Sequence, residues 1–386
     1  KFRRITLPLI TPGLFAGGTI VFIWSFTELG TPLMLNYTKC APVQIFDGLK
    51  EIGSNPFPYA LVIVLLTCSL SLYALSKWLF GGKAYAMQSK AATTFATIKA
   101  TGLRGLLVML PFLVVVGFAL LPHAGVILNS FAVPGSWYQS VLPQSFTLGN
   151  YDEALGHAMT LGGIRNSLLF SSLAVMFNMV FGIAIAFVVV RSDIRLRGTL
   201  DTMSMLPLAV PGLVMAFGYL GISNTLANLP SVKESEFLQS LFDVRTNPTL
   251  FLVIAYGIRR LPYMVRSAVA GLQQTSVTLE ESAANLGASP FKTMRRITLP
   301  LITANLIAGA LLAFAFSMLE VSDSLMLAQR QDYYPITKTI YELSELIGTG
   351  KFVASALGVW AMLFLAVMII GSSIILGKKM GALFRA

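Results

Sequence analysis

Two carboxylates are notable because each lies late in a long apolar segment. Glu28 and Glu320 follow Pro8 and Pro300, each by 20 residues. A carboxylate within a membrane-spanning helix indicates a functional site by default, and carboxylate oxygens are ligands of hard cations. Because one span takes about 20 residues, both would lie near the far face, where the alternative is simple hydration. Glu28 and Glu320 are therefore candidate residues of a pathway across a membrane.

The other reactive residue types do not form a catalytic or metal-binding pattern. His123 and His157 lack such a spacing, and Cys68 lies within an apolar segment, so no disulfide framework is expected. The phosphate-binding pattern GxxxxGK[ST] is absent, as are HExxH and a nucleophile elbow. The sequence predicts no catalytic residue, no metal site and no cofactor on this chain.

Composition places the chain in a membrane. Its residues are 55% hydrophobic and 12% charged, whereas a soluble domain carries roughly 25% charge. Long apolar segments in lipid must satisfy their own backbone hydrogen bonds and are therefore helices, and the alternating pattern of an outer-membrane barrel is absent. We predict an all-α polytopic membrane protein.

Eight apolar segments are candidate spans. They cover residues 12–33, 59–80, 105–128, 166–190, 203–221, 250–265, 301–319 and 355–376. Pro207 and Pro211 interrupt the fifth segment and predict a kink there.

Basic residues gather in five short clusters between these segments. The clusters are Lys1, Arg3 and Arg4; Lys77, Lys83, Lys90, Lys99 and Arg104; Arg191, Arg195 and Arg197; Arg259, Arg260, Arg266, Lys292, Arg295 and Arg296; and Lys378, Lys379 and Arg385. With strict alternation, all five lie on one side, which the positive-inside rule assigns to the cytoplasm together with both termini. Because the net charge of +11 is not gathered in one patch, it indicates contact with membrane lipid and no nucleic-acid binding.

The nine residues RRITLPLIT occur twice, at 3–11 and 295–303. The match extends without gaps through Glu28 and Glu320 to a shared LML, and IFDGLKEIG later resembles IYELSELIG. Parallel repeats of this kind are common in transporters. The second copy has four predicted spans upstream and the first has none. We therefore expect the first repeat to be N-terminally truncated by about four helices, with twelve spans in a complete protein.

This reasoning predicts three regions. Residues 1–80 are the C-terminal remnant of the first half with about two spans, 81–104 a cytoplasmic connector, and 105–386 the second half with about six spans. A polar loop near 272–300 belongs to the second half. It reads as two short helices broken at Gly287, with Glu280 and Glu281 suited to a helix N-terminus and Pro300 to the first turn of the next span.

This loop resembles the EAA loop of ABC-importer permeases, written EAA, three residues, G, nine residues, I-x-L-P. The matching positions are Glu281, Ser282 and Ala283, then Gly287, then Ile297, Leu299 and Pro300. Ser282 replaces the first alanine of the motif. The first copy keeps only the end of the motif, at Ile5, Leu7 and Pro8. The stretches LPLAVPGLVMAFGYLG and YGIRRLPYMVRSAVAGLQQ also resemble the fused permeases of ferric-iron importers.

The resemblance implies a division of labour. The loop, including Glu280 and Ala284, would form a coupling helix that docks on a separate ATPase subunit. Two such subunits would carry the ATP and Mg, and a periplasmic solute-binding protein would deliver the substrate at a bacterial inner membrane. Ala283 and Ala284 would allow close helix approach, and Glu281 would offer charge to a basic partner. With one complete loop, the chain by itself is expected to be incompetent for transport.

Ferric iron is the substrate that the resemblance favours, and carboxylates at the outer mouth suit its preference for oxygen ligands. Thiamine, a phosphonate or a polyamine are alternatives within the same class. A transporter driven by an ion gradient is the alternative of another class, but it would need a midplane site with coupling carboxylates. An intramembrane enzyme is disfavoured because no catalytic motif appears.

Overall fold

The computed structural model describes residues 7–48, 55–80, 101–137 and 140–383, and these residues are almost entirely helical. Within this part of the chain, the β pairing consists of one isolated bridge between Ala132 and Phe146. The predicted all-α class is confirmed. The predicted connector at 81–104 lies mostly outside the described residues, so the three-region division stays a prediction.

The first copy of the repeat forms four helices. They are α1 (Leu7–Phe26), α2 (Gly30–Met34), α3 (Ala41–Asp47) and α4 (Phe57–Phe80). The last part of the chain forms the equivalent set. It comprises α15 (Leu299–Met318), α16 (Ser322–Leu327), α17 (Ile336–Ser344) and α18 (Gly350–Leu383). Helices α1 and α15 each have 20 residues and lie 292 positions apart at both ends. The predicted repeat is therefore a repeat of structure.

Twelve short and long helices of the described residues lie between the copies. They are α5 (Gly102–Phe131), α6 (Gly149–Gly156), α7 (Ala158–Arg191), α8 (Arg197–Met205), η3 (Leu206–Leu208), α9 (Gly212–Ala227), α10 (Pro230–Lys233), α11 (Glu236–Phe242), α12 (Thr249–Gln274), α13 (Val277–Asn285), α14 (Pro290–Thr293) and the π-helical η4 (Met294–Thr298). A further 3-10 turn, η5, covers Gln331–Tyr333.

Helices α7, α12 and α15 form the centre of the bundle, and α12 packs closely against the other two. A buried apolar cluster that includes Ala186, Met264 and Ile302 joins them. Gly182 permits this contact, because a Cβ there would lie 2.5 Å from Cγ of Met264. Small residues at such crossings let membrane helices approach closely.

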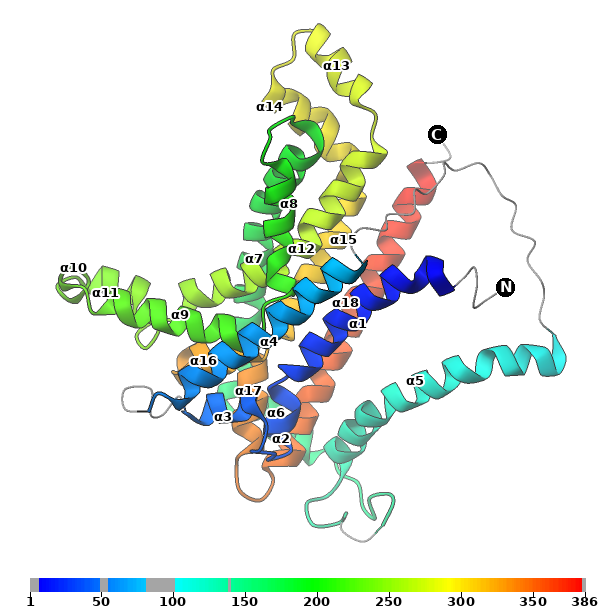
Figure 1. Ribbon diagram of the computed structural model, residues 1–386. Helices are drawn as coiled ribbons and strands as arrows, with labels where there is room; N and C mark the ends of the chain where they lie inside the picture. The colour runs from blue at the N-terminus through cyan, green and yellow to red at the C-terminus, as the bar shows by residue number, and fades with distance from the viewer. Residues whose placement is uncertain (1–6, 49–54, 81–100, 138–139, 384–386) are drawn as a thin grey trace.

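Two ends of the bundle can be told apart in Figure 1. The loop of α13 and α14 projects from one end, while α2, α3, α6 and α17 gather at the other. Helices α9, α10 and α11 extend sideways, because α9 bends by 100° from the α8–η3 segment. Pro207 and Pro211 lie at this bend, so the predicted kink is confirmed.

Five helices in the described part of the chain are long and apolar enough to cross a membrane, or six if the bent pair counts as one span. The predicted spans 12–33 and 250–265 are not among them. Helix α1 ends at Phe26, so the last residues of the first predicted span belong to α2. Helix α12 has 26 residues but carries three arginines, Arg259, Arg260 and Arg266, and this charge sets it apart from the apolar spans.

Candidate functional site

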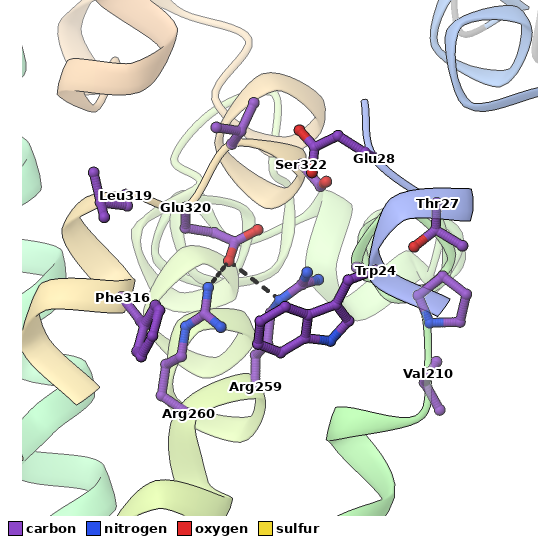
Figure 2. Close-up of a pocket in the computed structure, with 13 residues that line it drawn as sticks. Trp24, Thr27, Glu28, Val210, Arg259, Arg260, Phe316, Leu319, Glu320 and Ser322 are labelled. Carbon is purple, nitrogen blue, oxygen red and sulfur yellow. Dashed lines mark hydrogen bonds and ion pairs between the residues drawn. The ribbon is translucent and has the colours of Figure 1, made fainter. Parts of the chain in front are cut away.

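A cavity of about 210 Å³ lies where the two copies of the repeat meet. Its lining includes three pairs of residues that are equivalent in the repeat. The pairs are Trp24 with Phe316, Thr27 with Leu319, and Glu28 with Glu320. Residues Pro211 and Gly212, at the start of α9, also line the cavity. So do Arg259 and Arg260 of α12 (Figure 2). The end of α1 and the end of α15, each with the residues that follow directly, therefore face one shared space.

Glu320 is held at this cavity by two arginines. Its side chain is 3% exposed, and its Oε2 lies 3.2 Å from Nε of Arg259 and also accepts from Nη2 of Arg260. Figure 2 shows both guanidinium groups pointing toward this carboxylate. A buried carboxylate without a counter-ion would be strongly unfavourable, so the adjacent arginines of α12 explain how Glu320 is tolerated there. The alternative that Glu320 is simply hydrated is wrong.

The start of α9 is shaped around Arg259. A Cβ at Gly212 would lie 1.4 Å from Nη1 of Arg259. Pro211 is the N-cap residue of α9 and ends the preceding turn. The bend between η3 and α9 therefore leaves a space that the Arg259 guanidinium occupies. A side chain at position 212 would fill that space.

Further polar groups lie behind Glu320. The hydroxyls of Tyr256 and Ser324 are 2.5 Å apart, and the hydroxyl of Ser324 donates to the Glu320 carbonyl. Asp323 is completely buried, and neither carboxylate oxygen has a hydrogen-bond partner among the described residues. The sequence reasoning missed Asp323 and Tyr256. An acidic residue three positions after Glu320 and just before the apolar LML is the signal that could have indicated Asp323.

Glu28 differs from its equivalent. It is exposed, and one of its carboxylate oxygens accepts from the backbone N–H of Gly30 at 3.0 Å. It lines the same cavity as Glu320, yet the ion pairs described above involve Glu320 alone. The hydrated alternative therefore fits Glu28.

The adjacent arginines correct one sequence interpretation. Arg259 and Arg260 were grouped with a basic cluster on the cytoplasmic side. They lie instead in the middle of α12, where Arg260 is 8% exposed and its guanidinium lies 5.4 Å from the ring centroid of Phe316. Two arginines within an apolar helix indicate a buried partner, and this signal in YGIRRLPYM could have predicted the pair with Glu320.

The α13–α14 loop has the predicted two-helix form. Gly287 has a φ of +78°, and its N–H donates to Ala284 O at 2.9 Å, while Ala288 N donates to Ala283 O at 3.0 Å. These two bonds form a Schellman motif, which ends a helix with a residue in the left-handed region. The predicted break at Gly287 is confirmed.

The loop divides its side chains between two faces. Ala283 is buried at 7% exposure, whereas Glu281, Ser282 and Ala284 are exposed. Of the two alanines expected to allow close helix approach, Ala283 alone is buried against the protein. Glu280 faces the bundle, where it pairs with Arg191 at 3.2 Å.

Comparison with known proteins identifies the family. Residues 178–378, more than half of the chain, match the family described as binding-protein-dependent transport system inner membrane component. The chain belongs to this family. The match includes α12, the α13–α14 loop and the second copy of the repeat, and therefore both Glu320 and the residues that resemble the EAA motif.

Named relatives include transport permeases with different cargo. The chain is 30% identical over 331 residues to the ferric transport system permease protein FbpB of Actinobacillus pleuropneumoniae, covering 83% of this chain and 44% of that protein. It is 36% identical over 157 residues to the molybdenum transport system permease protein ModB of Escherichia coli, covering 39% of this chain and 65% of that protein. The chain spans about half the length of the ferric relatives it matches.

A solved structure supports the fold of this permease. A chain of a bacterial ABC transporter involved in the import of the acidic polysaccharide alginate superposes with a TM-score of 0.54 at 19% identity. The match covers 71% of this chain and 96% of that chain. The helical arrangement is therefore one that ABC-transporter chains adopt.

The remaining motif positions of the permease flank the start of α15. Ile297 and Leu299 are half-buried, and Pro300 is exposed in the first turn of α15, as predicted. Residues 294–298 form a π-helical turn, which the sequence did not indicate. In the first copy, Ile5 lies outside the described residues, Leu7 begins α1, and Pro8 lies within it.

A lysine surrounded by aromatic rings joins the two copies at the opposite end of the permease. Nζ of Lys338 lies 5.3 Å from the ring centroid of Tyr341, 5.4 Å from that of Tyr334 and 6.0 Å from that of Phe46. It also pairs with Glu342 at 2.8 Å. Phe46 and Tyr341 are equivalent residues of IFDGLKEIG and IYELSELIG, and their centroids are 6.0 Å apart. We call Lys338 and these three rings the aromatic seal.

A resident metal site is not formed by the described side chains of the permease. Among them, no group of three or more His, Cys, Asp or Glu is placed to hold a metal ion. His157 instead caps α7, where its Nδ1 accepts from Met159 N at 3.3 Å.

Proposed function

We propose that this chain is the membrane-spanning permease of a bacterial ABC importer for ferric iron. The observation that carries the proposal is the cavity lined by equivalent residues of both copies, Glu28 and Glu320 among them. A path that serves two related halves is expected where their equivalent surfaces meet, and the sites of transporters built from repeats lie at the repeat interface. Glu28 and Glu320 are the proposed pathway carboxylates.

The charges of the cavity support a gated path. Glu320 is paired with Arg259 and Arg260, so it is not free to bind a cation in this arrangement. Glu28 is exposed and free of those ion pairs. A ferric ion would first meet Glu28, and an opening that separates α12 from α15 would then release Glu320 from the arginines.

The α13–α14 loop supports coupling to an ATPase. We propose that Glu281, Ser282, Ala284 and the exposed side chains Leu286 and Phe291 contact a separate ATPase subunit. Leu286 is 90% exposed and Phe291 is 67% exposed, so both apolar side chains are available for contact with a partner. Ala283, Gly287, Ile297, Leu299 and Pro300 would keep the shape of the loop.

The wider assembly is also part of the proposal. It comprises two ATPase subunits that hold ATP and Mg, and a periplasmic solute-binding protein at the end opposite the loop. The permease would lie in the inner membrane with its loop and both termini in the cytoplasm. The basic clusters of the sequence support this orientation.

Ferric iron is favoured over oxyanions as the substrate, because the ferric relative matches a larger share of this chain than the molybdenum relative does. The ferric relative matches 83% of this chain, whereas the molybdenum relative matches 39%. Carboxylate oxygens suit a hard cation, although two arginines in the same cavity would also suit an oxyanion. Thiamine, phosphonate and polyamine remain alternatives of the same class.

The proposal is tested by co-purification with the ATPase subunit and by uptake of radioactive ferric iron. Gly287→Pro should abolish iron-stimulated ATP hydrolysis while membrane insertion is retained. Proline fixes φ near −65°, so it is incompatible with the φ of +78° at Gly287 and removes the N–H that closes the helix. The matched control is Gly348→Pro, because Gly348 has a φ of +88° in the loop before α18.

The control variant Gly348→Pro should still co-purify with the ATPase subunit. Normal iron-stimulated hydrolysis in Gly287→Pro would contradict the docking role. Uptake that follows an ion gradient and needs no ATPase subunit would instead support a secondary transporter. Uptake of molybdate without uptake of iron would support the permease function, but the proposed substrate would then be molybdate instead of ferric iron.

A further inference from the structure

We propose that Arg191 and Glu280 are positioning residues that fasten the α13–α14 loop to three helices of the bundle, so that movement of the loop moves those helices. The inference rests on the proposed coupling function and adds a division of roles within it. Glu280 faces inward and holds the loop, whereas its neighbour Glu281 faces outward. We call Arg191, Thr275, Glu280 and Thr298 the loop clamp.

Arg191 joins the ends of two long helices to the loop. It is the last residue of α7, and its Nε donates to both carboxylate oxygens of Glu280 at 3.2 Å. Its Nη2 donates to Leu272 O at 3.0 Å, to Thr275 O at 3.1 Å and to Thr275 Oγ1 at 3.0 Å. Cations are favourable at a helix C-terminus, where the last carbonyls lack partners. One guanidinium thus ties the end of α7 to the end of α12 and to α13.

Glu280 extends the connection to α15. It lies in the first turn of α13, where a negative charge is favourable. Thr298 Oγ1 donates to its Oε1 at 3.1 Å. Thr298 is 2% exposed and is the last residue of the π-helical turn that leads directly into α15. The carboxylate therefore contacts both the end of α7 and the entry to α15.

Burial distinguishes this ion pair from its neighbours. The side chains of Arg191 and Glu280 are 8% and 17% exposed, whereas Arg197 and Asp193 in a nearby pair are 51% and 103% exposed. Exposed pairs contribute little because water screens them. Charged hydrogen bonds in a largely buried, fully partnered network are stronger and geometrically defined. The clamp is therefore suited to transmit displacement, and the exposed pair is not.

The loop has few other attachments. The main packing neighbours of α13 are the short α14 and the π-helical turn, and Ala283 is the buried residue of α13. Without the clamp, α13 would be linked to α7 and α12 mainly through the chain itself. A push from a docked subunit would then bend the loop instead of moving α7, α12 and α15 together.

The test compares Glu280→Gln and Arg191→Lys with the matched control Asp193→Asn in the assembled transporter. Glutamine keeps the shape of Glu280 but loses its charge, and lysine loses the fork that reaches several acceptors. Co-purification of the ATPase subunit and its ATP hydrolysis should persist. The amount of substrate taken up per ATP hydrolysed should fall at least about fivefold, within the usual range of coupling between sites. Asp193→Asn should leave this ratio unchanged.

A double-mutant cycle makes the result specific to the pair. The variant with both Glu280→Gln and Arg191→Lys should be no worse than the more affected single variant, because each change breaks the same contact. A role in folding alone would lower the amount of assembled transporter and leave uptake per ATP unchanged, and that result would overturn the inference. Additive effects of the two changes would also overturn it.

Hydrogen exchange separates failure of this inference from failure of the proposed function. If wild-type protein does not bind an ATPase subunit, the proposed function fails. The loop clamp can then still be tested on its own. It predicts faster amide exchange over Val277–Asn285 in Glu280→Gln than in wild type or in Asp193→Asn. Unchanged exchange there would overturn the clamp, whatever the outcome for the ATPase.

Discussion

The two copies of the repeat share helix bounds but place equivalent residues in different surroundings. Helices α1 and α15 begin and end at matching positions, and Glu28 and Glu320 follow them in the same turn. Glu320 is buried between two arginines, whereas Glu28 is exposed. Helix α12 makes the difference, because it packs closely along α15 and brings Arg259 and Arg260 to that copy.

The comparison indicates which properties are local and which depend on neighbours. Helices α1 and α15 share their first five residues and keep the same start, length and end, so these properties are local. The state of each glutamate depends on a helix that is distant in sequence. A repeat can therefore keep its architecture while its two carboxylates take different roles, one fixed in an ion-pair network and one open to the cavity.

The largest expected effect comes from removing the charge of Glu320. Glu320→Gln leaves Arg259 and Arg260 without their counter-ion, and breaking a buried ion pair on one side costs about 3–5 kcal/mol. Glu28→Gln should change the free energy of unfolding by less than about 0.5 kcal/mol, as is usual at exposed positions. Denaturant unfolding of the purified protein in detergent measures both.

Glu320→Asp serves as the control, because it keeps the charge and shortens the side chain. It should be less destabilising than Glu320→Gln. Equal losses for Glu28→Gln and Glu320→Gln would mean that the two copies have the same environment in solution, contrary to the structure.

A smaller difference is expected between Phe316 and Trp24, the equivalent aromatic residues of the cavity. The ring of Phe316 stacks on Tyr263 with centroids 5.0 Å apart, and Arg260 lies over it at 5.4 Å. Trp24 is 41% exposed. Phe316→Ala should therefore destabilise the protein by about 1–2 kcal/mol more than Trp24→Ala, from the lost ring pair and cation–π contact.

The same unfolding measurement decides this comparison. If Trp24→Ala is the more destabilising change, then the size of the ring outweighs its contacts. Combining Phe316→Ala with Arg260→Met should show a smaller extra loss than the sum of the single changes, since both remove one contact.

Sequence reasoning predicted the local features well. The repeat follows from RRITLPLIT, the bend from Pro207 and Pro211, and the loop break from Gly287. Each depends on residues close together in the chain, where proline and glycine restrict or free the backbone directly. The residue types of the motif suggested the loop as a coupling site, which stays a prediction. The inward direction of Glu280 was not predicted, because it depends on Arg191 from another helix.

The charged core was the main error of the sequence interpretation. Adjacent arginines near the end of a predicted span suggested a cytoplasmic flank, since α12 was expected to end at residue 265. The helix continues to Gln274, which places Arg259 and Arg260 inside the bundle. Hydropathy detects apolar length, and it does not detect a helix whose charges are neutralised by neighbours. That pairing is a tertiary property, so it could not be read from one segment.

The smallest expected difference concerns the aromatic seal, where Phe46 and Tyr341 are equivalent. Lys338 lies closer to the ring of Tyr341, at 5.3 Å, than to that of Phe46, at 6.0 Å. Cation–π attraction extends to roughly 6 Å, so Tyr341→Leu should destabilise the protein more than Phe46→Leu, by about 0.5 kcal/mol.

Lys338→Met provides the internal control for this difference. Tyr341→Leu and Phe46→Leu are expected to lower the free energy of unfolding by different amounts. Without the ammonium group, the part of this difference that comes from cation–π attraction should disappear. A double-mutant cycle measures that part directly. If the difference persists unchanged in the Lys338→Met background, then it comes from packing of the rings against each other. The contact between Phe46 and Tyr341 would in that case be apolar, and Lys338 would be held there by Glu342 and Tyr334.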